Sequence, residues 1–396
     1  MKNKKLEGNT IIAINSAKKI IEIFLGPFLT AYFIKTSVES VVDLSIYYIF
    51  SYILLAIGSF IVASIIKNKF RIGMFRIGVI TTFFYIMTII VLKEQVVNHL
   101  GLIAVLYGIS QSCYWFPYNL FLTNKIDNNI RTEYTVKSKN VSKIIEILIP
   151  LLLGTAISAT NYESTALIIL GVSFIQIILS FILTPENEDK LDNLNLKKTW
   201  NELKGNKQIR NMLKTEFYAG MNASDGALTV LITIIIFNSF KTDMNLGIIN
   251  SITAVLTMFF IYMFGKIYKR RDDNRIIILS SIIPVITIFS ILLWRNNITI
   301  LIYNVCYSLF VTVLILARDI RLFNIADSRI IDKNNQSEFF AIRECILNMG
   351  RVAGYSLLLI AGLSGNQLIL NIMMVVLAFS ILAMGINIRK IEKFEE

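Results

Sequence analysis

An arginine lies in the middle of a long apolar stretch near the carboxyl end of the chain. At helical spacing, Glu344, Asn348, Arg351 and Tyr355 share one face of this stretch, and apolar residues occupy the other faces. Arg351 is about eleven residues, or ~16 Å of helix, from the charged end of the stretch. An arginine at that depth in a membrane costs at least ~2.5 kcal/mol, so we expect it to face protein or water and to bind a counter-charge.

Two roles are open for the guanidinium of Arg351. Its planar fork suits an anionic substrate group, which it would bind through two parallel hydrogen bonds. Alternatively, it neutralises a carboxylate of another span, for which Glu146 and Asp225 are the candidates. Gly350 and Gly354 form a small-residue face beside it, which predicts that a neighbouring helix approaches this stretch closely.

Three carboxylates in apolar stretches are candidates for carrying a proton. They are Glu22, Glu146 and Asp225. Burial favours the neutral form of a carboxyl group and a nearby cation favours the charged form, so a carboxylate that alternates between these settings loads and releases a proton. The alternative is that these carboxylates form fixed ion pairs between helices with Lys18, Lys19 and Arg351.

Other polar side chains lie on the same few stretches and complete the predicted substrate and coupling site. The residues are Lys18, Gln111, Trp115, Tyr118, Asn222, Asn304 and Asn348. The aromatic side chains of Trp115 and Tyr118 are able either to stack on a flat or cationic substrate or to pack between helices. The sequence leaves both interpretations open.

The composition excludes most other chemistry. The chain has one histidine and three cysteines, and their positions fit neither a metal site nor a catalytic triad. No Gly-x-x-x-x-Gly-Lys-Ser/Thr loop occurs, so the chain is not expected to be an ATP-driven pump. We therefore expect no enzymatic activity, no cofactor and no metal.

Hydropathy indicates a polytopic membrane protein. Hydrophobic residues make up 55% of the chain, and the mean hydropathy is +0.63. Twelve apolar stretches are long enough to span a bilayer. They are residues 10–34, 44–66, 75–92, 100–123, 141–160, 164–184, 212–239, 245–265, 275–294, 298–320, 340–363 and 367–388.

The basic residues predict the orientation of these spans. Of the 39 lysines and arginines, only Lys35, Lys93, Lys241 and Arg295 lie in one alternate set of connections, and the opposite set is strongly basic. The positive-inside rule therefore predicts that both termini are cytoplasmic. The net charge of +12 reflects this orientation, and we expect no nucleic-acid partner.

The chain divides into two similar halves. A shift of about 205 residues aligns the stretch after Thr132 with the stretch after Ser337 and sets Glu146 opposite Arg351. The predicted domains are a six-helix bundle at residues 1–184, a cytoplasmic linker at residues 185–211 and a second six-helix bundle at residues 212–396. A basic amphipathic helix around Trp200 is expected to lie on the inner membrane surface.

Six plus six spans, a cytoplasmic middle loop, cytoplasmic termini and polar first, fourth, seventh and tenth spans together resemble the major facilitator superfamily. The resemblance covers essentially the whole chain. It implies an all-α integral membrane protein with twelve transmembrane helices in two pseudo-symmetric six-helix bundles. It also implies that the four polar spans line a central cavity and that the third, sixth, ninth and twelfth spans face lipid.

The family's short loop signature after the second span, repeated after the eighth, is present in part. The sequence keeps its basic residues, but neither copy has the aspartate in its usual place. These residues and the charged inner ends of the tenth and eleventh spans are the predicted cytoplasmic gate: Lys67, Arg71, Arg76, Lys269, Arg270, Arg318, Asp319, Glu338 and Arg343. The segments CYWFPYNLF and RECILNMGR resemble an uncharacterised bacterial branch of the family.

The resemblance implies a secondary active transporter that moves a small molecule across the bacterial plasma membrane by alternating access. Pro150 and Gly154 of the fifth span are similar to residues of the family's exporters, which favours export, and we expect H+ to be the coupling ion. The other expected partner is the lipid bilayer, with the protein acting as a monomer. The alternatives are a lipid or amphiphile flippase of the same fold and a non-transporting membrane sensor or accessory protein.

Overall fold

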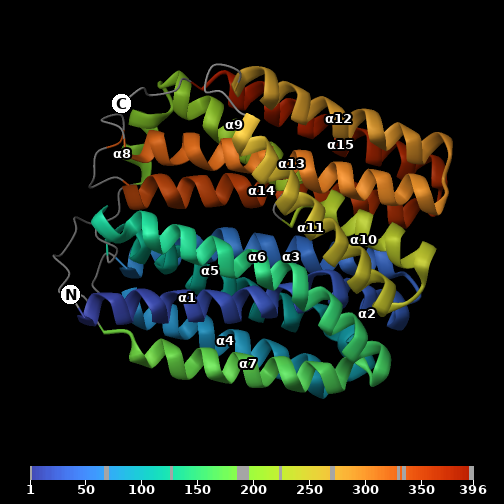
Figure 1. Cartoon of the computed structure of the whole chain (residues 1–396), viewed down its shortest axis with the longest axis horizontal. Coiled ribbons are helices and arrows are strands. Elements are labelled where there is room, and N and C mark those ends of the chain that lie inside the picture. Colours follow the sequence, from blue (N-terminus) through green and yellow to red (C-terminus); the bar gives the residue numbers. More distant parts are fainter. Residues whose placement is uncertain are drawn as a thin grey trace. The chain divides into compact units, whose positions relative to one another are not determined.

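The chain is helical over most of the residues that the structure describes (Figure 1). The computed structural model describes residues 2–66, 71–124, 128–184, 196–222, 225–267, 273–327, 331 and 336–391. Three predicted gate residues, Lys67, Lys269 and Arg270, lie outside these ranges. So does the first part of the predicted linker.

Each of the predicted spans corresponds to a helix or to an interrupted helix. The helices are α1 (Lys2–Ile23), a π-helical turn (Phe24–Phe28), α2 (Leu29–Thr36), α3 (Ser40–Ile66), α4 (Arg71–Leu92), a 3-10 helix (Lys93–His99), α5 (Leu100–Asn124), α6 (Asn128–Ala159), α7 (Tyr162–Ile182), α8 (Leu196–Leu203), α9 (Lys207–Asn222), α10 (Ala227–Phe240), α11 (Asp243–Ile267), α12 (Asp273–Leu293), α13 (Asn297–Asp327), α14 (Gln336–Ser364) and α15 (Gln367–Arg389). The first span consists of α1, the π-helical turn and α2, and the seventh of α9 and α10.

The composition of the helices fits a membrane. Among the described residues, 10 stretches are long and apolar enough to cross it, and one of these comprises both α4 and α5. The first helix is not among them, and it carries Lys18, Lys19 and Glu22. On α7 and α15, large apolar side chains such as Phe174, Phe181 and Phe379 are exposed. Such surfaces are expected where helices face lipid.

Contacts divide the chain into two compact units. Unit 1 comprises Met1–Ser37, Ile53–Leu194 and Thr242–Ser251. Unit 2 comprises Val38–Tyr52, Asn195–Lys241 and Ile252–Glu396. This division follows contacts and not the order of the chain, since α3 and α11 each contribute to both units. The bundles at residues 1–184 and 212–396 therefore stay a prediction.

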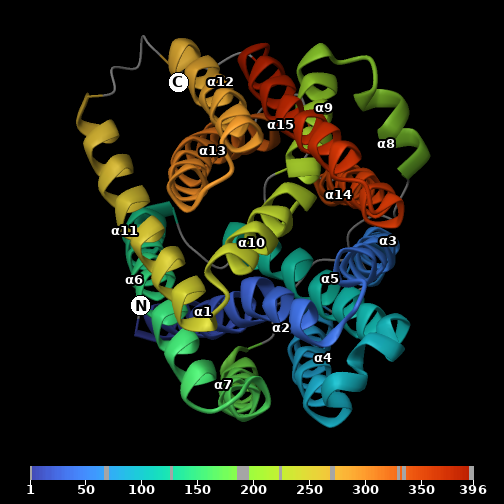
Figure 2. The ribbon, with the colours of Figure 1, turned by 90° about the vertical axis from the view of Figure 1, so that its right-hand side faces the viewer.

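In unit 1, α4 packs against α5 and α7, and α1 packs against α6 and α7. Figure 2 shows α4 and α7 side by side. Ile14, Phe75 and Tyr114 belong to the buried core between these helices. The segment of α11 that belongs to unit 1 crosses α6 closely, because a Cβ on Gly154 would lie 2.6 Å from the main-chain oxygen of Asp243.

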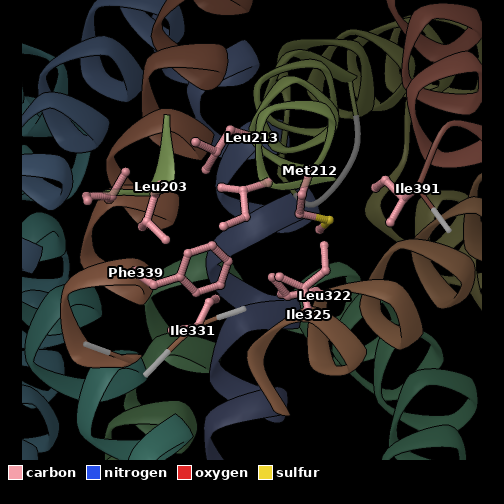
Figure 3. Packing of buried hydrophobic residues seen from close by; sticks show 10 residues of the cluster. Leu203, Met212, Leu213, Leu322, Ile325, Ile331, Phe339 and Ile391 are labelled. Atoms are coloured by element: carbon pink, nitrogen blue, oxygen red, sulfur yellow. The ribbon is translucent and has the colours of Figure 1, made fainter. Parts of the chain in front are cut away.

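In unit 2, α9 packs against α14 and α15, and α12 packs against α13 and α15. A cluster of buried apolar side chains lies where α9 and α14 begin (Figure 3). It contains Leu203, Ile209, Met212, Leu213, Leu322, Ile325, Ile331, Phe339, Ile342 and Ile391. Leu203 belongs to α8, so the apolar face of this linker helix packs on protein, while Trp200 is exposed.

The backbones of α9 and α14 touch. A Cβ on Gly350 would overlap the carbonyl oxygen of Phe217, and a Cβ on Gly220 would overlap that of Leu347. A Cβ on Gly354 would lie 2.9 Å from another carbonyl oxygen of α9. The close approach predicted from Gly350 and Gly354 is therefore confirmed.

Replacing Gly350 with alanine is expected to destabilise the protein by about 2 kcal/mol. An overpacking penalty of up to ~3 kcal/mol outweighs the gain of ~1 kcal/mol in helix propensity. The matched control is Gly171→Ala in α7, where a Cβ would meet nothing within 4 Å and alanine should stabilise the helix. Thermal unfolding in detergent compares the two variants, and equal midpoints would contradict the backbone contact.

Candidate functional site

The seventh span is interrupted between α9 and α10. The first helix ends at Asn222 and the second begins at Ala227, and Asp225 between them has a φ of 68°, in the left-handed region. Aspartate tolerates this region better than most residues. Gly226 follows, where a Cβ would lie 2.7 Å from main-chain atoms of α9. The span predicted at residues 212–239 lies within the membrane-span candidate Lys207–Phe240. The interruption inside it was not predicted, because hydropathy does not register a local break in the backbone.

The carboxylate of Asp225 faces Arg351 of α14. Its Oδ2 lies 3.9 Å from Nη2 of Arg351. The guanidinium donates a hydrogen bond of 2.8 Å to Oδ1 of Asn348 and lies over the ring of Tyr52, 4.7 Å from its centroid. The side chain of Arg351 is 11% exposed, whereas that of Asp225 is 73% exposed. A guanidinium fixed by its neighbours thus faces an accessible carboxylate.

Two tyrosines hold the backbone of the interruption. The hydroxyls of Tyr52 and Tyr355 donate to the main-chain oxygen of Asp225 at 3.1 Å and 2.9 Å. Tyr48 stacks on Tyr355, with ring centroids 4.6 Å apart. These hydrogen bonds satisfy a carbonyl that the interruption removes from the helical pattern. Sequence reasoning missed Tyr48 and Tyr52, although their spacing of one helical turn on α3 was a usable signal.

Asn222 anchors the end of α9. Its side-chain amide donates to the hydroxyl of Ser380 at 2.7 Å, and its main-chain oxygen accepts a hydrogen bond from the hydroxyl of Tyr307. It therefore ties α9 to α15 and α13. Asn304, also predicted as a site residue, lies elsewhere on α13 and donates to Thr253 of α11 at 3.0 Å.

A second charged group, in unit 1, joins α1 and α6. The ammonium of Lys19 lies 3.2 Å from Oε1 of Glu146, and that of Lys143 lies 2.6 Å from Oε2. Lys18 is fully buried, and its ammonium lies 3.9 Å from Oε1 of Glu22. We call these five residues the lysine cluster. The structure thus places Glu146 beside lysines of its own unit.

Aromatic residues of α5 adjoin the lysine cluster. The ammonium of Lys18 lies 4.9 Å from the centroid of the Tyr114 ring. Tyr114 stacks on Tyr118 with centroids 5.7 Å apart, and both are buried. Trp115 meets Tyr114 edge-on at 5.2 Å and donates to the side-chain oxygen of Gln111 at 2.9 Å. Of the predicted residues on α5, Trp115 is only half-buried, while Gln111 and Tyr118 are buried.

In unit 1, the predicted gate residues that the structure describes lie on α4. Arg71 is buried, although it is the first residue of its helix. Arg76 donates to the main-chain oxygens of Ser180 and Leu183 at 3.3 Å and 3.1 Å. Since the last carbonyls of a helix have no partner within it, Arg76 closes the end of α7.

In unit 2, the predicted gate residues surround a carboxylate that was not predicted. Glu216 of α9 is fully buried, with Oε2 2.9 Å from Nη2 of Arg343 and Oε1 3.7 Å from Nε of Arg318. Arg318 also pairs with Asp319 at 2.8 Å. Glu338 is buried near the start of α14. Glu216 is therefore the shared counter-charge of two of the predicted gate arginines.

Comparisons with known proteins find one matching family profile and solved structures with a similar fold. A sequence profile described as Major Facilitator Superfamily matches residues 142–320. The crystal structure of the nucleoside transporter NupG matches with a TM-score of 0.67 at 12% identity, over 100% of both chains. The human organic anion transporter MFSD10 (TETRAN) matches with a TM-score of 0.65 at 9% identity, over 97% of this chain and 99% of that one. No curated protein matches the sequence. The full-length matches confirm the predicted all-α fold.

Proposed function

We propose that this chain is a multi-pass secondary transporter of the major facilitator superfamily that exchanges protons for a small molecule, with Asp225 as the proton-carrying group. The family profile over residues 142–320 and the full-length fold matches support the proposal. The observation that carries the proposal is the pair of Asp225 and Arg351 at the interruption of the seventh span. Transporters of this kind bind substrate and coupling ion near the middle of the bilayer, often at interrupted helices.

Protonation would change the force between α14 and the interruption. Two unit charges about 4 Å apart attract by ~1 kcal/mol in water and by ~4 kcal/mol at an effective dielectric constant of ~20. The pair is partly exposed, so the attraction of Asp225 for Arg351 lies between these limits. A neutral Asp225 loses it, whereas the hydrogen bonds from Tyr52 and Tyr355 to the main chain persist. The proton thus controls one contact of the interruption.

Asp225 suits this role better than Glu146. Each carboxylate oxygen of Glu146 faces a lysine ammonium, and its side chain is 27% exposed. Asp225 faces Arg351 at the longer distance of 3.9 Å and is 73% exposed. A proton donor in an aqueous pathway therefore reaches Asp225 more readily.

The remaining parts of the proposal rest on the sequence and on one packing feature. We propose export, because the proline and glycine of α6 that resemble those of exporters lie at its close crossing with α11. The alternation of basic connections supports cytoplasmic termini, and we place the protein in a bacterial plasma membrane. We also propose that it works as a monomer, with the linker at residues 185–211 joining two halves.

Proteoliposomes with an imposed pH gradient test this function. A trapped pH-sensitive dye reports the interior pH while pools of metabolites, antibiotics or lipids are added. We expect one pool of small molecules to dissipate the gradient only when the protein is present. Dissipation by the lipid pool alone would favour the flippase, and no effect of any pool would favour a sensor.

A further inference from the structure

The lysine cluster of unit 1 lies at the middle of the first span. Glu7 of α1 accepts a hydrogen bond from Thr184, just beyond the end of α7. Tyr32 of α2 donates to Glu163, at the start of α7, at 2.9 Å. The first span therefore runs the length of α7, which is 21 residues or ~31 Å. Lys18 lies about midway between Glu7 and Tyr32, at the depth where a transporter binds its substrate.

One carboxylate of the cluster is shared between two ammonium groups. Oε1 of Glu146 faces Lys19 and Oε2 faces Lys143, so its single negative charge is divided between two positive charges. Lys18 and Glu22 form a second, longer contact of 3.9 Å. Among the described residues, the cluster thus contains three ammonium groups and two carboxylates. Two partly exposed ammonium groups that share one carboxylate are able to bind an anionic group as well.

Two lysines of the cluster, Lys19 and Lys143, are partly exposed, whereas the third, Lys18, is buried. The side chains of Lys19 and Lys143 are 36% and 31% exposed, whereas that of Lys18 is 0% exposed. An anionic group would therefore contact Lys19 and Lys143 and compete with the carboxylate of Glu146 for their ammonium groups. Lys18 acts at short range through its charge, since its ammonium is fixed over the ring of Tyr114.

An aromatic surface of α5 adjoins Lys18. Trp115 is half-buried and packs edge-on against Tyr114, the ring beneath Lys18. An aromatic side chain that is partly accessible offers a flat apolar contact to a ligand. The neighbouring elements thus present ammonium groups from α1 and α6 and an indole from α5.

We propose that unit 1 binds an organic anion, a molecule with an aromatic body and a carboxylate or sulfonate group, through Lys19, Lys143 and Trp115. This substrate class rests on the proposed transport function and extends it. The proton site is the pair of Asp225 and Arg351 in unit 2, and the anion site is the lysine cluster in unit 1. The two sites use different residues, so they can be tested separately.

Equilibrium binding to the purified full chain tests the anion site. The probes are 2-naphthoate, 2-naphthylmethylammonium and 2-naphthylmethanol, which share one ring system and differ in charge. We expect only the naphthoate to raise the thermal midpoint of the wild type. Stabilisation by the amine alone, equal stabilisation by all three probes, or no stabilisation by the naphthoate would each overturn the proposal.

Two variants assign the binding to the cluster. Lys19→Gln removes an ammonium and is expected to weaken apparent naphthoate affinity by about tenfold or more. Glu146→Gln removes the competing carboxylate and is expected to increase that affinity. Lys19→Arg keeps the charge and should retain binding. If Lys19→Gln does not fold, Lys143→Gln provides the same comparison, and equal losses in Lys143→Gln and Glu146→Gln would overturn the assignment.

These outcomes are distinct from those of the proposed function, because binding is measured without a pH gradient. Anion binding without proton-driven transport would leave the anion site in place and remove the coupling. Proton-driven transport of a cation would leave the coupling in place and overturn the anion site.

Discussion

Replacing Asp225 with asparagine is expected to reduce proton-driven transport by up to about 150-fold, the upper range of coupling free energies of ~1–3 kcal/mol. Asparagine has the size of aspartate and tolerates a left-handed φ, so the interruption of the seventh span should keep its shape. The hydrogen bonds from Tyr52 and Tyr355 reach the main chain and survive the change. Only the charge that faces Arg351 is lost. Tracer accumulation in proteoliposomes with and without a pH gradient measures the effect.

Substrate exchange provides the internal control for Asp225→Asn. Exchange of labelled for unlabelled substrate requires binding and alternating access but no net proton movement, so we expect it to continue. Asp225→Glu, which keeps a carboxylate, should retain part of the proton-driven accumulation. Full accumulation by Asp225→Asn would contradict the proton-carrying role, and loss of exchange together with accumulation would indicate a structural one.

Replacing Glu216 with glutamine is expected to destabilise the protein by about 3 kcal/mol, the lower part of the range for breaking a buried ion pair. Glu216 is 0% exposed and lies beside Arg318 and Arg343, which are 7% and 10% exposed. Without the charge of Glu216, two buried guanidinium groups lie close to each other and lack their shared counter-charge. Arg318 and Arg343 keep contacts with Asp319 and Glu344, which is why the higher end of the range is not expected.

Thermal unfolding in detergent measures this effect, with Glu202→Gln as the matched control. Glu202 lies 3.9 Å from Lys198 on α8, with side chains 47% and 71% exposed, and such surface pairs contribute about 0–1 kcal/mol. We therefore expect a large fall in the midpoint for Glu216→Gln and little change for Glu202→Gln. Similar midpoints for both variants would show that the buried network does not stabilise unit 2.

The sequence predicted the elements better than it predicted the contacts between them. Span number and the polar faces follow from hydropathy and helical periodicity, which are local properties. For the close contact between α9 and α14, the sequence predicted the face on α14, because Gly350 and Gly354 are spaced one turn apart on an apolar helix. The sequence did not predict that α9 packs on this face, because no local signal specifies which helix fills a small-residue face.

The charged contacts show the same limit. The sequence offered Arg351 either Glu146 or Asp225, and the structure places Asp225 beside it because α9 and α14 pack together. Glu146 instead meets Lys143, one helical turn away on α6, and Lys19 of α1. A carboxylate has several cations within reach in a bundle, so packing and not charge decides between them.

Two features of unit 2, the buried Glu216 and the interruption at Asp225, were not predicted from the sequence, for different reasons. Glu216 was missed because it lies near the charged beginning of the seventh span, where a carboxylate is expected at a membrane surface. The interruption at Asp225 was missed because the span was read from hydropathy alone. Two glycines and an asparagine close to Asp225 are poor helix formers and were a usable signal.

Proton release on substrate binding is the most direct measurement of coupling at Asp225. Purified protein in weakly buffered detergent solution is mixed with the substrate that the pH-gradient screen identifies, and a pH indicator records the change. Because linkage is reciprocal, a substrate that binds in exchange for a proton displaces up to one proton from the wild type and none from Asp225→Asn. Equal release from both proteins would contradict the assignment of proton coupling to Asp225.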